Sequence, residues 1–287
     1  MIDLRVGTSL ANSIDRVRWA ATEAGNVNVV GIAAHEVLNN YLRWTEDAAG
    51  QLGNVLPRST VTDLLHTPAY WHFRGADGTQ PRLIPALLRE LDTQKATLEE
   101  IAAGLVAAEI RWAGGLGEAY TIAVPDTTMF LNGDAPFEDI DWRQVTNSRP
   151  SVRVVVPLAV VDELDRLKRQ GNNTTSKLAR YSINWLDEHL PFAVDQRTRL
   201  ATEGIYKTTI EVLVEDTPRR LPDADLSIIA SAQQLGTLAG APTTLVTRDL
   251  GMALRARAIT QPVVHLRSTG AKPKQRDAAP ATGAASM

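Results

Sequence analysis

The chain has 287 residues, of which 44% are hydrophobic and 22% are charged, and its formal net charge is −3. This composition predicts a globular protein with a packed core, long enough for one large or two modest domains. The absence of cysteine excludes disulfides, zinc–thiolate sites and catalytic thiols. The negative net charge argues against a large, uniformly basic nucleic-acid surface.

The first residues carry charges at Asp3, Arg5, Asp15 and Arg16 and lack a long apolar run, so they are not expected to be a signal peptide. No stretch approaches the ~18 consecutive apolar residues of a membrane span. We therefore expect a soluble, cytoplasmic protein that does not contact membranes.

Residues 8–119 are predicted to be helical. Apolar residues recur there at steps of three and four around a polar face, which is typical of amphipathic helices. The stretch His72–Gln80 predicts a loop, and Gly114–Gly117 breaks the pattern as a junction. We expect residues 1–118 to form an all-α accessory domain.

From Thr121 onward, short apolar or β-branched runs alternate with helical stretches. The predicted strands are Thr121–Val124, Val152–Val156, Thr208–Val214, Thr243–Val246 and Val263–Leu266. The strands are apolar without alternation, which predicts that helices cover both faces of the sheet. Residues 119–267 are thus expected to form a three-layer α/β/α sandwich with a mostly parallel sheet of about five strands. The small, polar residues 268–287 are expected to be a disordered tail.

Acidic residues collect where ligands bind in such a fold, beyond the carboxyl ends of the strands. Asp126 follows the first predicted strand and Asp249 follows the fourth. Glu163 lies in the helix after the second strand, beside its apolar stripe, and Asp225 lies at the start of the Ala224–Leu238 helix. The sequence therefore predicts four carboxylates at one edge of the sheet.

Each of these acids alone has a simpler explanation. Aspartate is a favoured helix N-cap, which is the first interpretation of Asp126 or Asp249 taken singly, and Glu163 alone is typical of a solvated helix face. Four gathered carboxylates repel one another, however, and this cost is tolerable mainly when a cation lies between them. Their hard oxygens, without His or Cys in these motifs, favour Mg²⁺ or Mn²⁺ over zinc.

The ordered segments VPDTTMFL, VVPLAVVDELDRLK, LPDADLSIIASAQQL and LVTRDLGMALRARA resemble the PIN domain family, over about residues 121–267. In that family, which includes toxin–antitoxin ribonucleases and RNA-processing proteins, acidic residues hold one or two Mg²⁺ or Mn²⁺ ions. The resemblance implies that Asp126, Glu163, Asp225 and Asp249 are the catalytic and metal-binding residues. It also implies that Thr247 is the hydroxyl residue often found two positions before the last acid, and that the reaction is metal-assisted hydrolysis of a phosphodiester.

Two positions depart from the family's pattern. The first motif commonly reads Asp-Thr-Asn or Asp-Ser-Asn, whereas this chain has Thr128 at the third position. Thr128 keeps a hydroxyl but loses the amide, which puts a supporting hydrogen bond in doubt. Asp223 adds a further carboxylate to the third motif and is a rival metal ligand to Asp225. We favour Asp225, because buried helix positions follow it at the family's spacing.

Basic residues near this edge are candidate phosphate contacts. Lys177, Arg180 and Arg169 surround the predicted turn Gly171–Asn173, and Arg248 stands between Thr247 and the last acid. Exposed bases on helices more often serve solvation than ligand binding. Likewise, the ordinary interpretation of Asp165 is an ion pair with Arg169 at i+4.

Three functions compete on this sequence. The first is an endoribonuclease that cuts single-stranded RNA. Toxins of the PIN family contain little more than the domain itself, so residues 1–118 are expected to regulate the enzyme, guide RNA, or mediate a homodimer or bind a protein partner. The second is a PIN-fold module that binds RNA or protein without cutting. The third, a structure-specific DNA nuclease, ranks last because no helical arch or helix–hairpin–helix glycines are present.

Overall fold

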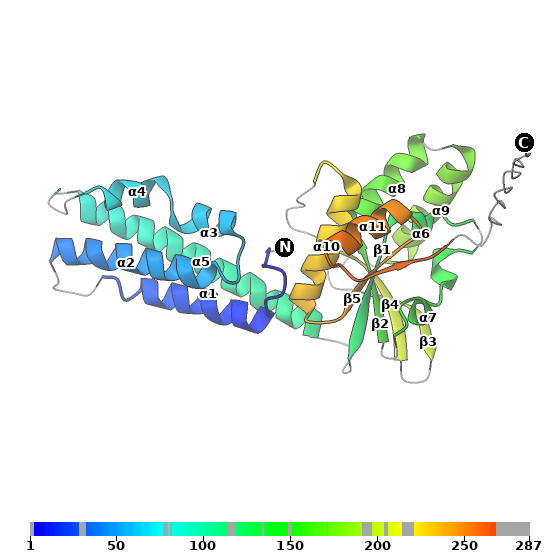
Figure 1. The fold of residues 1–287 in the computed structure, drawn as a ribbon, viewed down its shortest axis with the longest axis horizontal. Helices are drawn as coiled ribbons and strands as arrows, with labels where there is room; N and C mark the ends of the chain where they lie inside the picture. Colours follow the sequence, from blue (N-terminus) through cyan, green and yellow to red (C-terminus); the bar gives the residue numbers. More distant parts are fainter. Residues whose placement is uncertain are drawn as a thin grey trace, which may run out of the picture.

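The computed structural model describes residues 3–28, 33–76, 80, 82–113, 119–133, 135–148, 151–170, 172–190, 197–203, 206–213 and 221–267. Within these ranges a helical region precedes an α/β region (Figure 1). The predicted junction Gly114–Gly117 and the predicted tail 268–287 lie outside the described residues.

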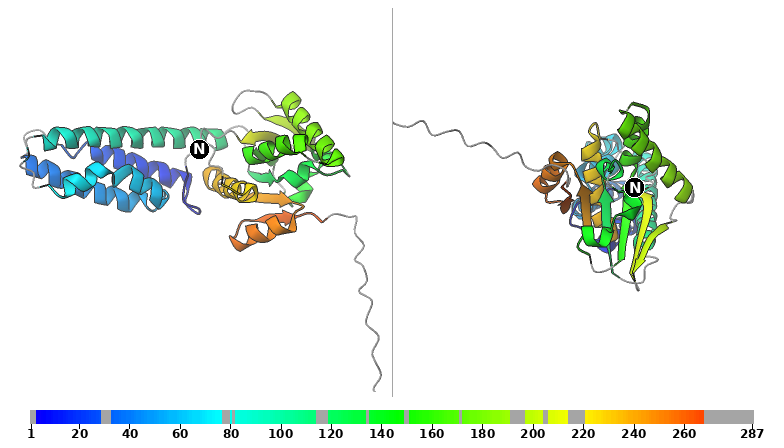
Figure 2. Two further views of the ribbon diagram at one scale, coloured as in Figure 1. Left: turned by 90° about the horizontal axis from the view of Figure 1, so that it is seen from above. Right: turned by 90° about the vertical axis from the view of Figure 1, so that its right-hand side faces the viewer.

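The helical region is built around one long helix, α5. Its helices are α1 (Leu10–Ala24), α2 (Ala34–Leu52), α3 (Arg58–Leu65), α4 (Pro68–Arg74) and α5 (Leu83–Ala113). Helix α1 packs against α5 and α2, and Figure 2 shows α5 running the length of this region and ending beside the α/β region. The amphipathic pattern is confirmed, because Leu87, Leu98 and Leu105 are fully buried on α5. In the described part of the chain, no helix combines the length and apolar character needed to cross a membrane.

The α/β region contains one six-stranded sheet with the order β3-β4-β2-β1-β5-β6. All neighbouring strands are parallel except β3 and β4, which are antiparallel. The strands are β1 (Tyr120–Pro125), β2 (Ser151–Pro157), β3 (Thr198–Glu203), β4 (Tyr206–Leu213), β5 (Thr243–Thr247) and β6 (Val263–His265). The helices are α6 (Thr127–Phe130), the 3₁₀ turn η1 (Phe137–Asp139), α7 (Trp142–Val145), α8 (Leu158–Gln170), α9 (Asn173–His189), α10 (Ala224–Ala239) and α11 (Leu250–Ala258).

The central strands are buried on both faces, as their apolar sequences predict. Every residue of β2 is buried, and so is every residue of β1 after Tyr120. The five predicted strands are all present, and the sixth, β3, was missed. The predicted loop at His72–Gln80 also begins too early, because α4 continues to Arg74.

The chain reverses direction across the sheet between β1 and β5. From β1 it proceeds through β2 to β4 on one side, and then returns through α10 to β5 and β6 on the other. The carboxyl ends of β1 and β5 thus flank the position at which an open α/β sheet forms a crevice for a ligand. Their register pairs Pro125 with Val246, so the next residues on both strands, Asp126 and Thr247, are neighbours.

The helical region contacts the α/β region at two places. Helices α1 and α5 pack against α10, and Gln234 of α10 exchanges two hydrogen bonds with the backbone of Leu4, of 3.1 and 2.9 Å. At the end of α5, the carbonyl of Trp112 accepts a hydrogen bond from the Tyr120 hydroxyl at 2.6 Å. The two regions therefore share a packed interface.

A buried ion pair lies beside this interface. Arg153 of β2 and Glu211 of β4 are 1% and 2% exposed, and their side chains are joined by hydrogen bonds of 2.7 and 3.0 Å. The Arg153 guanidinium also lies over the Trp112 ring, 4.4 Å from its centre, and Arg111 reaches Glu211 at 3.6 Å. These contacts fix the last turn of α5 to the strands.

Candidate active site

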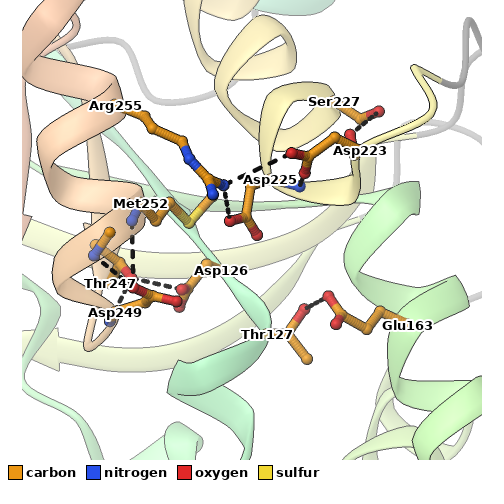
Figure 3. A network of polar contacts seen from close by, with 11 residues as sticks. Asp126, Thr127, Glu163, Asp223, Asp225, Ser227, Thr247, Asp249, Met252 and Arg255 are labelled. Atoms are coloured by element: carbon orange, nitrogen blue, oxygen red, sulfur yellow. Dashed lines mark hydrogen bonds and ion pairs between the residues drawn. The ribbon is translucent and has the colours of Figure 1, made fainter.

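The candidate site lies at the carboxyl ends of β1 and β5, where the predicted acids come from four different segments. Asp126 follows β1, Asp249 follows β5, Asp225 lies in the first turn of α10, and Glu163 lies on α8. Figure 3 shows these side chains around one space, together with Thr127, Thr247 and Arg255. The fold thus brings the four predicted acids to the same edge of the sheet.

Asp126 is the most deeply buried of the four acids, with 3% of its surface exposed. Its Oδ2 accepts a hydrogen bond of 2.5 Å from the Thr247 hydroxyl, and its Oδ1 accepts one of 2.6 Å from the Thr128 hydroxyl. Burial raises the pKa of Asp126 to about 6, although both hydroxyls act to lower that pKa. Asp126 precedes α6 without a side-chain cap hydrogen bond, so capping alone does not explain this residue.

Thr128 stands where the PIN domain family, which the sequence resembles, commonly has Asn. Its hydroxyl makes two hydrogen bonds. It donates to Asp126 and accepts from the backbone N–H of Arg248 at 2.9 Å. The loop after β1 is thereby joined to the loop after β5. The hydroxyl supplies the support that the missing amide had put in doubt.

Asp249 is both a helix cap and a member of the acidic group. Its Oδ1 accepts hydrogen bonds from the backbone N–H groups of Gly251 and Met252, at 2.6 and 3.2 Å, which identifies it as the N-cap of α11. Its own N–H donates to the Thr247 hydroxyl at 2.8 Å. Capping therefore explains one oxygen of Asp249 and leaves Oδ2 for another partner.

Asp223 and Asp225 have different partners. Asp223 is the N-cap of α10, because its Oδ1 accepts the N–H of Asp225 at 2.9 Å. The Asp225 carboxylate instead faces Arg255 of α11, whose Nη1 lies 2.5 Å from Oδ2 of Asp225 and 3.7 Å from Oδ2 of Asp223 (Figure 3).

The pKa of Asp225 shows that the acids act on one another electrostatically. Burial raises this pKa and the charge of Arg255 lowers it, while the charges of Asp223, Asp249 and Glu163 each raise it. Asp249 likewise raises the pKa of Asp126. Charges on α8 and at the end of β5 thus act on the pKa of Asp225.

Glu163 faces α6 across the site. Its Oε2 accepts a hydrogen bond of 2.6 Å from the Thr127 hydroxyl, and its Oε1 forms an ion pair of 3.2 Å with Arg166. The side chain is 24% exposed, which agrees with its predicted place beside the apolar stripe of α8.

The donor set fits a hard divalent cation in its chemistry, since it consists of carboxylate and hydroxyl oxygens at one edge of the sheet. Among the described residues, however, no three Asp, Glu or His side chains are close enough together to hold a metal ion. Three of the carboxylates have other partners. Asp225 faces Arg255, Glu163 faces Thr127 and Arg166, and Asp249 caps its helix.

The predicted phosphate contacts lie at different depths. Lys177 and Arg180 are exposed on α9, and Arg169 is paired with Asp165, as the i+4 spacing predicted. Arg248 is part-buried beside the acids, and its Nε is buried without a hydrogen-bond partner among the described residues. Arg248 therefore adjoins the acids directly, because it lies between Thr247 and Asp249 in the chain.

Two residues of the site were missed from the sequence, Thr127 and Arg255. Thr127 stands between two residues already singled out, so its position was a usable signal. Arg255 had no such signal, because both Arg255 and Arg257 flank the buried positions of α11. Only the packing of α11 beside α10 shows which of the two reaches the acids.

Comparison with known proteins identifies a family. The model of a family described as PIN domain matches residues 123–267, which is half of the chain and covers all four acids. No protein with a curated description matches the chain.

Proposed function

The chain belongs to the PIN domain family, and from this we propose that it is a metal-dependent endoribonuclease. The observation that carries the proposal is the Asp126 carboxylate, which is 3% exposed at the crevice of the sheet and electrostatically coupled to Asp249. Burying a carboxylate among other acids is costly for folding. This cost has a functional explanation when the carboxylate serves to bind a cation.

We propose Asp126, Asp225 and Asp249 as metal ligands, with Glu163 binding directly or through a water. Asp223 is the weaker candidate, because its carboxylate caps α10. When bound, Mg²⁺ or Mn²⁺ would lower the pKa of a water and offset charge on the scissile phosphate.

Thr128 and Thr247 position the Asp126 carboxylate. Each hydroxyl donates to a different oxygen, which fixes the plane of the carboxylate and favours its ionised form. The ionised form is the one that binds a cation. Thr127 holds Glu163 in the same way.

Single-stranded RNA is the proposed substrate, because a flexible strand can bring one phosphodiester to a carboxylate that is almost completely buried. Arg248, Lys177 and Arg180 are the proposed phosphate contacts, with Arg248 next to Asp249 in the chain. We propose that this activity takes place in the cytoplasm. Residues 1–118 are proposed as an accessory domain that mediates a homodimer or binds a protein partner.

A PIN-fold module that binds RNA or protein without cutting is the second candidate. The observation in its favour is that Asp225 and Glu163 already have cationic partners, Arg255 and Arg166. Their charges are partly offset without a metal ion.

The test is cleavage of mixed single-stranded RNA and DNA by the purified full chain, with Mn²⁺ or Mg²⁺ and then with EDTA. We expect RNA cleavage that EDTA abolishes and that Asp126→Asn lowers by on the order of 100-fold or more. Metal-independent RNA binding without cutting would favour the second candidate. Cleavage that persists in Asp126→Asn would overturn the assignment of the acids.

A further inference from the structure

Arg255 occupies the place of a counter-ion in the acidic centre. It projects from the last turn of α11 to two carboxylates of α10, at 2.5 Å from Asp225 and 3.7 Å from Asp223 (Figure 3). The Arg255 side chain is 49% exposed and that of Asp225 is 31% exposed. An ion pair this open to water is weak enough to be exchanged for another partner.

The carboxylate that Arg255 holds is one that the proposed function requires. The Arg255 guanidinium, 2.5 Å from Oδ2 of Asp225, would repel a divalent ion held by the same carboxylate at the ~2.0–2.6 Å of a metal–oxygen bond.

The guanidinium also has an alternative partner of the right chemistry. Arginine presents a planar set of donors that matches a phosphate as well as a carboxylate. Arg255 lies at the same edge of the sheet as Arg248, which we propose to contact phosphate. A guanidinium released from Asp225 would need only to turn its exposed side chain toward bound RNA.

We propose that Arg255 exchanges between Asp225 and the substrate, an inference that rests on the proposed function. Without metal, Arg255 offsets the charge of Asp225 and Asp223 and remains bound to the Asp225 carboxylate. A divalent ion competes with it for Asp225, and the displaced guanidinium binds a phosphate of the RNA. Arg255 therefore weakens metal binding and strengthens RNA binding.

The experiment measures both affinities in the full chain, with Mn²⁺ titrations followed by electron paramagnetic resonance and RNA binding followed by fluorescence anisotropy in Ca²⁺. Arg255→Gln is compared with Arg257→Gln, which removes the same charge from the same exposed last turn of α11. We expect Arg255→Gln to bind Mn²⁺ about three- to tenfold more tightly, as removing one nearby positive charge from a partly exposed site predicts. The same variant should bind RNA more weakly, Arg255→Lys should be intermediate, and Arg257→Gln should leave Mn²⁺ affinity unchanged.

The outcomes separate this inference from the function on which it rests. If Arg255→Gln and Arg257→Gln bind Mn²⁺ and RNA alike, the exchange is wrong and the metal centre stands. If Arg255→Gln lowers both affinities, Arg255 has a structural role and the exchange is wrong. If neither the wild-type chain nor any variant binds Mn²⁺, the metal centre fails and the inference fails with it.

Discussion

The Thr247 hydroxyl donates a hydrogen bond of 2.5 Å to Oδ2 of Asp126 and joins the ends of the two strands at which the chain reverses direction. The two residues lie 121 positions apart in the sequence, and β2, β3 and β4 fold between them, so this contact forms only when β1 and β5 are in register. The orientation of Asp126, a proposed metal ligand, therefore depends on the register of β1 and β5.

Removing this hydroxyl should raise the pKa of Asp126 further. In Thr247→Val, burial still raises the pKa above its ordinary value, and one of the two hydroxyls that act against burial is gone. Because a metal needs the ionised carboxylate, the acid limb of Mn²⁺ binding should move to higher pH. Isothermal titration across pH checks this, with Thr247→Ser as the control that keeps the hydroxyl. Identical pH profiles for Thr247→Val and wild type would contradict the role given to Thr247.

Asp126 should make the metal-free protein less stable as pH rises. Its folded pKa of about 6 lies above the ordinary value of 3.8, so the folded state binds more protons than the unfolded state between about pH 4 and pH 6. The contribution of Asp126 to the free energy of unfolding is therefore fully present below pH 4 and is lost as pH rises through 6. The total loss is about 3 kcal/mol.

Asp126→Asn removes this ionisation and tests the prediction. In EDTA, the variant should be more stable than wild type at pH 8, and the difference should shrink toward pH 4. Urea denaturation at several pH values measures it. If the difference in free energy of unfolding between Asp126→Asn and wild type is the same at pH 4 and at pH 8, the raised pKa of Asp126 is wrong.

Two substitutions of Asp249 should distinguish its role as a helix cap from its proposed role as a metal ligand. Asp249→Ala loses the N-cap of α11 and should lower the free energy of unfolding by about 1 kcal/mol, whereas Asp249→Asn keeps a capping oxygen and should be nearly as stable as wild type. Both should lose metal-dependent cleavage. Thermal denaturation and RNA cleavage measured together check this, and an active Asp249→Asn would limit this residue to capping.

The Arg153–Glu211 pair should be important for stability. Glu211→Gln leaves the guanidinium of Arg153, which is 1% exposed, without its counter-charge, at a cost of about 3–5 kcal/mol. Asp165→Asn, which breaks partly exposed ion pairs with Lys168 and Arg169, should cost less than about 1 kcal/mol. Urea denaturation of both variants gives the comparison, and equal effects would contradict the weight given to the buried pair.

Sequence patterns predicted most of the α/β region because its strands are short apolar runs between turns. They missed β3, Thr198–Glu203, which has no such run and pairs only with β4 at the edge of the sheet. An edge strand of this kind is defined by its partner, and the partner is not visible in the local sequence.

The acids of the site were predictable for a related reason. The three aspartates each stand next to the end of a predicted strand or the start of a predicted helix, and Glu163 lies beside the apolar stripe of a predicted helix, so local signals placed them at one edge. Arg255 depends instead on how α11 is rotated relative to α10, and Thr128 on which hydrogen bonds its hydroxyl makes. Such contacts are set by packing between elements and leave no periodic signal.

The most direct test of the acidic centre is the position of a bound ion in a crystal of the full chain soaked with Mn²⁺. We predict an anomalous difference peak bounded by Asp126, Asp225 and Asp249, with the Arg255 guanidinium withdrawn from Asp225. A structure in which Arg255 remains on Asp225 and no peak lies beside Asp126 at saturating Mn²⁺ would contradict the account.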